Sequence, residues 1–175
     1  MKIQELKNEL QEVHSKFASY VLALTDPEFC STPQPEKWSA GQQLQHIVLS
    51  VGTLNRAIGN PDFMRSIEEM EPQRPPMGFE ELSAVYKRVI KKGTQAPARF
   101  VPAAIPTDQK AQVAEALRKA VGELCNLLDE YGDRLDAFTL PHPFIGRLSL
   151  REMVYFTICH AEHHFSIAKQ NIEEL

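Results

Sequence analysis

Residues 149–171 read SLREMVYFTICHAEHHFSIAKQN and carry the clearest pattern in this chain. Ser149 and Glu152 match the S-x-x-E capping box that opens a helix, and apolar residues then recur at helical spacing. His160 and His164 stand four positions apart, so both imidazoles lie on one face of the predicted helix. This spacing allows one helix to offer two nitrogen ligands to a single divalent metal ion.

Upstream of this helix the sequence predicts three further long helices, over residues 2–25, 39–58 and about 107–131. The first has apolar residues at steps of three and four, and the second opens at another capping box, formed by Ser39 and Gln42. Residues 26–38 contain three prolines and are expected to form a loop, as is the segment between the third and last helices.

The long connection over residues 60–107 is interrupted by prolines and holds one helical pattern, over about residues 79–92. A connection of this length is typical of two successive bundle helices that run parallel, because the chain must return along the bundle. The sequence therefore predicts an all-α four-helix bundle with a crossover that carries an extra short helix. We expect residues 1–175 to form one domain.

Composition limits the classes of function. The chain has 175 residues, 43% of them hydrophobic, and a net charge of -4, which argues against a nucleic-acid-binding surface. It contains no apolar run long enough for a transmembrane helix and no signal sequence at its first residues. Cys30, Cys125 and Cys159 are widely spaced, and we interpret them as buried thiols of a cytoplasmic protein.

Three other histidines have to be weighed beside the pair. The helical period alone places His46, on the second helix, at an exposed or rim position. Together with His160 and His164, however, it would complete a set of three imidazole ligands that leaves positions open for water or substrate. We expect His14 at the boundary or solvent side of the first helix, and His142, between two prolines, in a packing or rim role.

Several alternatives are weighed against a catalytic metal site. Taken alone, a histidine pair at this spacing is as consistent with hydrogen-bonded core or surface histidines as with metal ligands. The H-E-x-x-H metalloprotease motif fails, because Ala161 stands where it requires glutamate and Glu162 lies on another side of the helix. The Glu-x-x-His motifs of di-iron bundles are not visible, and Cys159 faces away from its neighbour His160.

Three motifs occur in order along the chain: Trp38-Ser39 with His46, the segment from His142-Pro143-Phe144-Ile145-Gly146-Arg147 to Glu152, and His160-x-x-His163-His164. Together they resemble the DinB-like superfamily, which includes the bacillithiol and mycothiol transferases and is distinct from the similarly named polymerase. The resemblance implies an up-down-down-up four-helix bundle, often dimeric, with a divalent metal held by His46, His160 and His164. It also implies that His163 is an extra histidine and not a ligand.

Characterised members that the chain resembles use the metal with a low-molecular-weight thiol in S-transfer or isomerisation. We therefore expect a cytoplasmic, homodimeric S-transferase that joins such a thiol to a small electrophile, with nickel or zinc bound, or else iron or manganese. No nucleic acid or membrane partner is expected. The alternatives are a non-catalytic, stress-related metal-binding protein and a metal-dependent hydrolase that uses the same ligands. Gln42, Gln43 and His163 are candidates for orienting the ligand rings.

Overall fold

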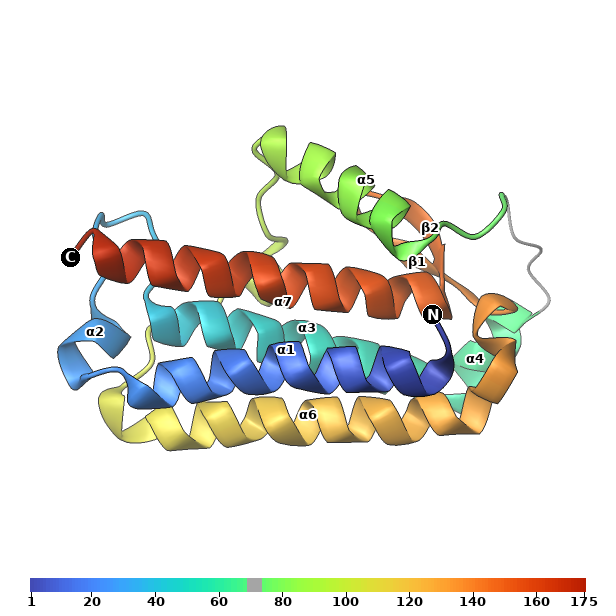
Figure 1. Cartoon of the computed structure of the whole chain (residues 1–175), viewed down its shortest axis with the longest axis horizontal. Coiled ribbons are helices and arrows are strands. Elements are labelled where there is room, and N and C mark those ends of the chain that lie inside the picture. Colours follow the sequence, from blue (N-terminus) through green and yellow to red (C-terminus); the bar gives the residue numbers. More distant parts are fainter. Residues whose placement is uncertain (69–73) are drawn as a thin grey trace.

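The computed structural model describes residues 1–68 and 74–175; residues 69–73, within the crossover, lie outside the described residues. Four long helices form the bundle: α1 (Ile3–Ala23), α3 (Ala40–Ile58), α6 (Lys110–Tyr131) and α7 (Leu150–Glu173). In Figure 1, α1 and α7 run in one direction and α3 and α6 in the other, so the up-down-down-up order is confirmed. Both α1 and α3 pack against α6 and α7, which places α1 and α3 at opposite corners.

The bundle core is built from the predicted apolar stripes, together with residues of the covering loops. Its largest fully buried side chains come mainly from the long helices: Leu6, Leu10, Phe17, Phe29, Leu44, Ile47, Ile58, Leu82, Leu117, Leu124, Leu128 and Leu135. Two capping boxes set the starts of the site helices, because Ser39 Oγ accepts from the Gln42 N–H and Ser149 Oγ from the Glu152 N–H, each at 3.2 Å.

The crossover lies along the outside of the bundle. It contains α4 (Pro61–Glu68), α5 (Phe79–Lys91) and the 3₁₀ turns η1 (Ala98–Phe100) and η2 (Thr107–Gln109), and α5 packs on α7 (Figure 1). The predicted helix over 79–92 is thus confirmed. Helix α4 was not predicted; Asn60 Oδ1 caps it by accepting from the N–H groups of Asp62 and Phe63 at 3.0 and 3.1 Å.

Glu152 ties the crossover to the bundle. Its buried carboxylate accepts from Arg74 Nη1 and from the Met77 N–H, both at 2.6 Å, just before α5 begins. The same side chain closes the capping box of α7 by accepting from the Ser149 N–H at 2.6 Å. One carboxylate therefore fixes both the start of α7 and the position of α5 beside it.

Two segments predicted as loops contain regular structure. Residues 26–38 include the short helix α2 (Asp26–Cys30), which starts at a capping box of Thr25 and Glu28 with Pro27 in its first turn. The segment before α7 contains the 3₁₀ turn η3 (Gly132–Asp136) and an antiparallel hairpin of β1 (Thr139–His142) and β2 (Gly146–Ser149). The prolines of these segments lie at positions that need no backbone N–H donor, so they did not exclude helix or strand.

The burial predictions for His14 and Cys30 were wrong. His14 is only 1% exposed, because α1 packs against α6 and α7 and its buried face is wider than one narrow stripe. Cys30 is exposed at the end of α2, whereas Cys125 and Cys159 are buried as expected. Within residues 1–68 and 74–175, none of the helices combines the length and apolarity needed to span a bilayer.

Candidate metal centre

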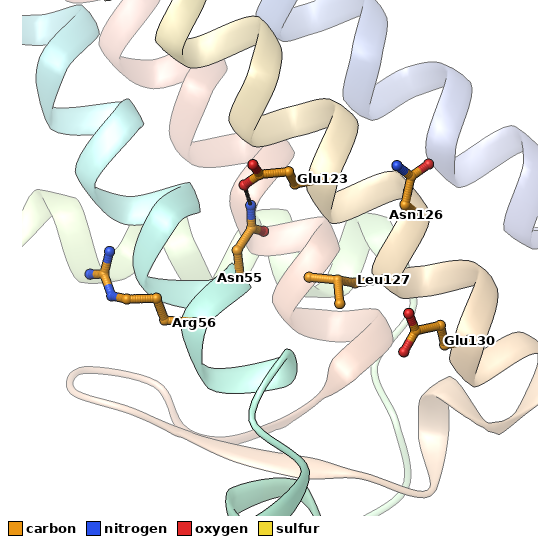
Figure 2. A pocket seen from close by; sticks show the side chains of 6 residues that line it. All are labelled: Asn55, Arg56, Glu123, Asn126, Leu127 and Glu130. Carbon is orange, nitrogen blue, oxygen red and sulfur yellow. Dashed lines mark hydrogen bonds between the residues drawn. The ribbon is translucent and has the colours of Figure 1, made fainter.

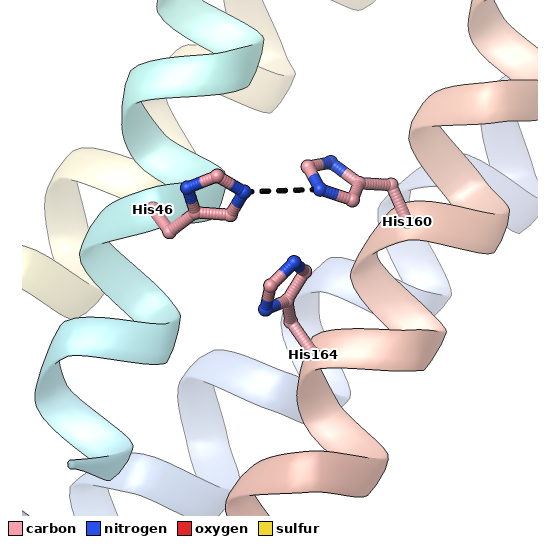
Figure 3. A group of neighbouring side chains, drawn as sticks. All are labelled: His46, His160 and His164. Carbon is pink, nitrogen blue, oxygen red and sulfur yellow. Dashed lines mark hydrogen bonds between the residues drawn. The ribbon is translucent and has the colours of Figure 1, made fainter. Parts of the chain in front are cut away.

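His46, His160 and His164 converge between α3 and α7 (Figure 3). Nε2 of His46 lies 3.0 Å from Nε2 of His160, and one ring nitrogen of each of the three lies within 4.8 Å of the others. Nitrogen ligands of a tetrahedral ion at about 2.0–2.1 Å would stand about 3.4 Å apart. The separations in the structure lie on either side of this value, so small shifts of the three rings would give each a bond to one central ion.

His46 is 4% exposed, so the exposed or rim position predicted from periodicity alone is wrong. The reason lies outside its own helix. Trp38, which precedes α3, packs with its ring centroid 5.0 Å from that of His46, and the Phe100 ring of the crossover lies at 6.3 Å. The helical period predicts only which face of α3 packs against the other bundle helices. Trp38 and Phe100 belong to the segments that connect the helices, so the period gives no sign of their contacts.

Hydrogen bonds fix two of the rings with Nε2 free to bind a cation. The Nδ1–H of His46 donates to the carbonyl oxygen of Phe100 at 2.7 Å, and that of His164 donates to Gln43 Oε1 at 2.5 Å. Each neutral ring with a protonated Nδ1 keeps its lone pair on Nε2. Ligand histidines are commonly oriented in this way. Of the candidate orienting residues, the structure assigns this contact to Gln43.

The third ring, His160, is held by aromatic side chains. It stacks on Phe156 with ring centroids 4.9 Å apart, and the Tyr86 ring stands edge-on at 6.1 Å. Without a metal, its Nε2–H can donate to the free Nε2 of His46 across the 3.0 Å contact. A bound cation would take the place of that proton.

Burial keeps the cluster neutral. It lowers the pKa of His160 and of His164 well below the ordinary value for histidine, and the neighbouring histidines lower both pKa values further. Burial also lowers the pKa of His46, partly offset by the hydrogen bond to Phe100. Neutral imidazole is the form that binds a metal. The donor set therefore fits a borderline divalent cation such as zinc or nickel.

The cluster borders a cavity of about 920 Å³. Helices α3, α5 and α7, the turn η1 and the β1–β2 hairpin all contribute to its wall. Much of the wall is aromatic or aliphatic: Trp38, Leu54, Phe63, Tyr86, Val89, Ile90, Phe100, Met153, Phe156 and Ile167. Its charged side chains, Glu36, Lys37 and Arg99, are exposed or half-buried. This is the size and character of a site for a small organic molecule.

The remaining histidines divide between this cavity and the core. His142 and His163 line the cavity, although neither belongs to the three-histidine cluster. His14 lies in the core, where its Nδ1–H donates to the Leu10 carbonyl at 2.7 Å and Nε2 has no partner in the described part of the chain. The sequence analysis did not predict the contact of His46 with the Phe100 carbonyl, because every residue has a main-chain carbonyl and the sequence does not show which one will be used.

A second cavity, of about 360 Å³, lies between α3 and α6 (Figure 2). Asn55 lines this cavity and links the two helices: its Nδ2 donates to the Ala120 carbonyl at 2.8 Å and lies 3.4 Å from Glu123 Oε2. These bonds join two core helices, and its lining contains no histidine or cysteine. We therefore assign this cavity a role in packing.

Comparison with known proteins agrees with the fold. A model of the DinB superfamily matches residues 9–168 of the chain. The chain belongs to the DinB superfamily. Among solved structures, this DinB-superfamily chain is similar to YfiT from Bacillus subtilis, described as a probable metal-dependent hydrolase with an unusual four-helix bundle topology. The two share 16% identity with a TM-score of 0.60, over 96% of this chain and 84% of YfiT. No curated protein matches the sequence.

Proposed function

We propose that this DinB-superfamily protein is a divalent-metal-dependent enzyme that transfers a low-molecular-weight thiol to a small organic electrophile. The observation that carries the proposal is the convergence of three neutral imidazoles, within 4.8 Å of one another, on a cavity of about 920 Å³. A bound divalent cation supplies the lowering of pKa that turns a thiol or a water molecule into a nucleophile at neutral pH.

The residues of the chain would have distinct tasks. His46, His160 and His164 would hold the cation through Nε2, while the Phe100 carbonyl and Gln43 keep two of these rings in the required tautomer. The aromatic wall would bind the organic part of the electrophile and exclude water from it. Three protein ligands leave a coordination position for the nucleophile, as in catalytic rather than structural sites.

Two features favour a thiol over water as the nucleophile. Among the described residues that line the cavity, the only carboxylate is Glu36, which is exposed, so no buried carboxylate stands beside the histidines to activate a water molecule. A thiol also needs a far smaller fall in pKa than water to ionise at neutral pH. The alternative of metal-dependent hydrolysis is favoured by one observation, the description of YfiT as a probable hydrolase.

The first test is metal content. We expect the purified protein to bind about one divalent ion per chain, and the variants His160→Ala and His164→Ala to lose it, because two nitrogen ligands cannot hold the ion tightly. His163→Ala is the matched control, since this histidine lines the same cavity but is outside the cluster. Elemental analysis by mass spectrometry measures the stoichiometry. An unchanged metal content in both ligand variants would remove the proposed centre.

An activity panel then separates the alternatives. Protein loaded with zinc or nickel is incubated with a chromogenic aryl halide and a small thiol, and separately with an activated ester without thiol. S-transfer predicts turnover that requires the thiol, whereas hydrolysis predicts turnover of the ester alone. Absence of both, with metal bound and a large loss of stability on its removal, would support the non-catalytic, metal-binding role.

A further inference from the structure

His142 is held in a defined position by the β1–β2 hairpin. It ends β1, and the following turn closes at Gly146, whose φ of 90° lies in the left-handed region that favours glycine. Within this turn the backbone N–H groups of Phe144 and Ile145 both point at Nδ1 of His142, at 3.3 and 3.2 Å. The imidazole therefore accepts hydrogen bonds from its own turn.

This arrangement determines which nitrogen carries the proton. A neutral imidazole has one N–H and one lone pair, and here the lone pair at Nδ1 is engaged by two donors. The proton must then be on Nε2. Burial lowers the pKa of His142 to about 4, so the ring is neutral at pH 7 and keeps this single N–H.

The Nε2–H is left without a protein acceptor in the described part of the chain. The ring lines the large cavity and lies edge-on to Phe156, with centroids 4.3 Å apart, and Phe156 stacks in turn on His160. Tyr86 also lines the cavity, with its ring edge-on to Phe156, and its hydroxyl is a second possible donor. That hydroxyl can rotate about its C–O bond, whereas the direction of the His142 Nε2–H is set by the turn. His142 thus offers a fixed donor inside a largely apolar wall.

We propose that His142 binds the substrate, by donating its Nε2–H to an oxygen atom of the molecule in the cavity. The proposal rests on the proposed function, in which the cavity is the substrate site, and it narrows the substrate to molecules with an acceptor oxygen such as a carbonyl, ester or nitro group. A half-buried N–H that lines a largely apolar cavity discriminates in favour of a ligand that can accept from it.

Two substitutions separate donation to the substrate from support of the turn. In His142→Asn the amide oxygen can stand where Nδ1 stands and accept from the turn, but no donor reaches the Nε2 position. In His142→Gln the amide N–H can reach the Nε2 position, but the acceptor of the turn is displaced. Donation to the ligand is therefore lost in the first variant and retained in part in the second.

The readout is binding of two thiols of equal chain length, methyl 3-mercaptopropionate and pentane-1-thiol, of which only the first carries a carbonyl. Trp38 is the one tryptophan of the chain and lines the cavity, so its fluorescence reports binding with or without added zinc. We expect His142→Asn to shift the ratio of the two Kd values about fivefold toward pentane-1-thiol, with a smaller shift in His142→Gln. An unchanged ratio in His142→Asn, or a larger shift in His142→Gln, would overturn the proposal.

A second measurement does not depend on the metal. Nitrogen-15 NMR of histidine-labelled, metal-free protein at pH 7 is expected to show His142 neutral with its proton on Nε2. A proton on Nδ1, or a charged ring, would also overturn the proposal. Failure of the proposed metal centre can be distinguished from failure of this proposal. In that case zinc would not bind, but the Nε2–H tautomer of His142 and the effect of His142→Asn on the preference for the carbonyl thiol would remain.

Discussion

At the scale of a single residue, Gln43 orients the ring of His164, a proposed metal ligand. Its Oε1 accepts from the Nδ1–H of His164, and the side chain is 4% exposed, so no water can easily replace it. We predict that Gln43→Leu weakens metal affinity by about 10- to 100-fold, because the His164 ring loses the partner that fixes its tautomer. Titration with zinc against a competing chelator measures this change.

Gln43→Glu is the control for this prediction, since a carboxylate oxygen also accepts from Nδ1–H. It is expected to retain or increase the metal affinity. If Gln43→Leu bound zinc as tightly as the unsubstituted protein, the hydrogen bond would have no part in organising the centre.

His14 makes the stability of the fold depend on pH. Burial lowers its pKa to about 4, against 6.5 for the unperturbed side chain, so the unfolded chain binds the proton more readily. The contribution of His14 to stability is therefore complete above about pH 6.5 and is lost as the pH falls toward 4. A shift of this size corresponds to about 3 kcal/mol.

We predict that His14→Leu flattens the decline in stability between pH 6.5 and 4, measured by urea unfolding of metal-free protein. Stability at pH 7 should change little or increase, because the substitution also removes a buried Nε2 that has no partner in the described residues. The other buried histidines keep part of the decline in both proteins. An equally steep decline in the variant would show that His14 contributes nothing to it.

At the scale of elements, the start of α3 depends on a close contact with α2. Gly41 lies against the fully buried ring of Phe29, and a Cβ there would stand 2.6 Å from the ring atom Cζ. A buried aromatic ring cannot move aside as a flexible side chain can. We predict that Gly41→Ala destabilises the protein by roughly 1–3 kcal/mol in urea unfolding.

The same helix offers a matched control. A Cβ at Gly52 would meet only the end of the Arg56 side chain, at 3.6 Å, so Gly52→Ala gains helix propensity without a clash. We expect it to stabilise by about 0.5–1 kcal/mol. Equal effects of the two substitutions would mean that α2 does not pack on α3 as described.

At the scale of the whole molecule, the proposed ion would join two long helices of the bundle. His46 belongs to α3, and His160 and His164 belong to α7. Because only the folded chain brings them together, a bound ion stabilises the native state by about 2.7 kcal/mol at a hundredfold excess over its Kd. We predict that chelation lowers the Tm by roughly 5–10 °C in a chain of this size.

Calorimetry with and without chelator tests this prediction, with His164→Ala as the control that should melt at the same temperature in both conditions. Identical Tm values for the unsubstituted protein in the two conditions would show that the histidine cluster holds no ion that stabilises the fold.

Sequence patterns anticipated the parts of the fold that depend on local physics. The four long helices and α5 follow from the 3.6-residue period, and the capping boxes at Ser39 and Ser149 mark the starts of α3 and α7. The spacing of His160 and His164 is likewise a local property of one helix. The up-down-down-up order was expected from the family resemblance and from the length of the crossover.

Other features depend on which segments meet in space. The burial of His46 and His14 and the Phe100 carbonyl that orients a ring come from contacts between residues distant along the chain. The hairpin that holds His142 is local in sequence, but its side chain reaches the cavity only because the hairpin lies beside α7. A helical period reports the face of one helix, but burial and tautomer depend on every element that packs against it. For this reason the sequence could name three histidines, whereas their convergence on one cavity emerged from the packing of α3, α7 and the crossover.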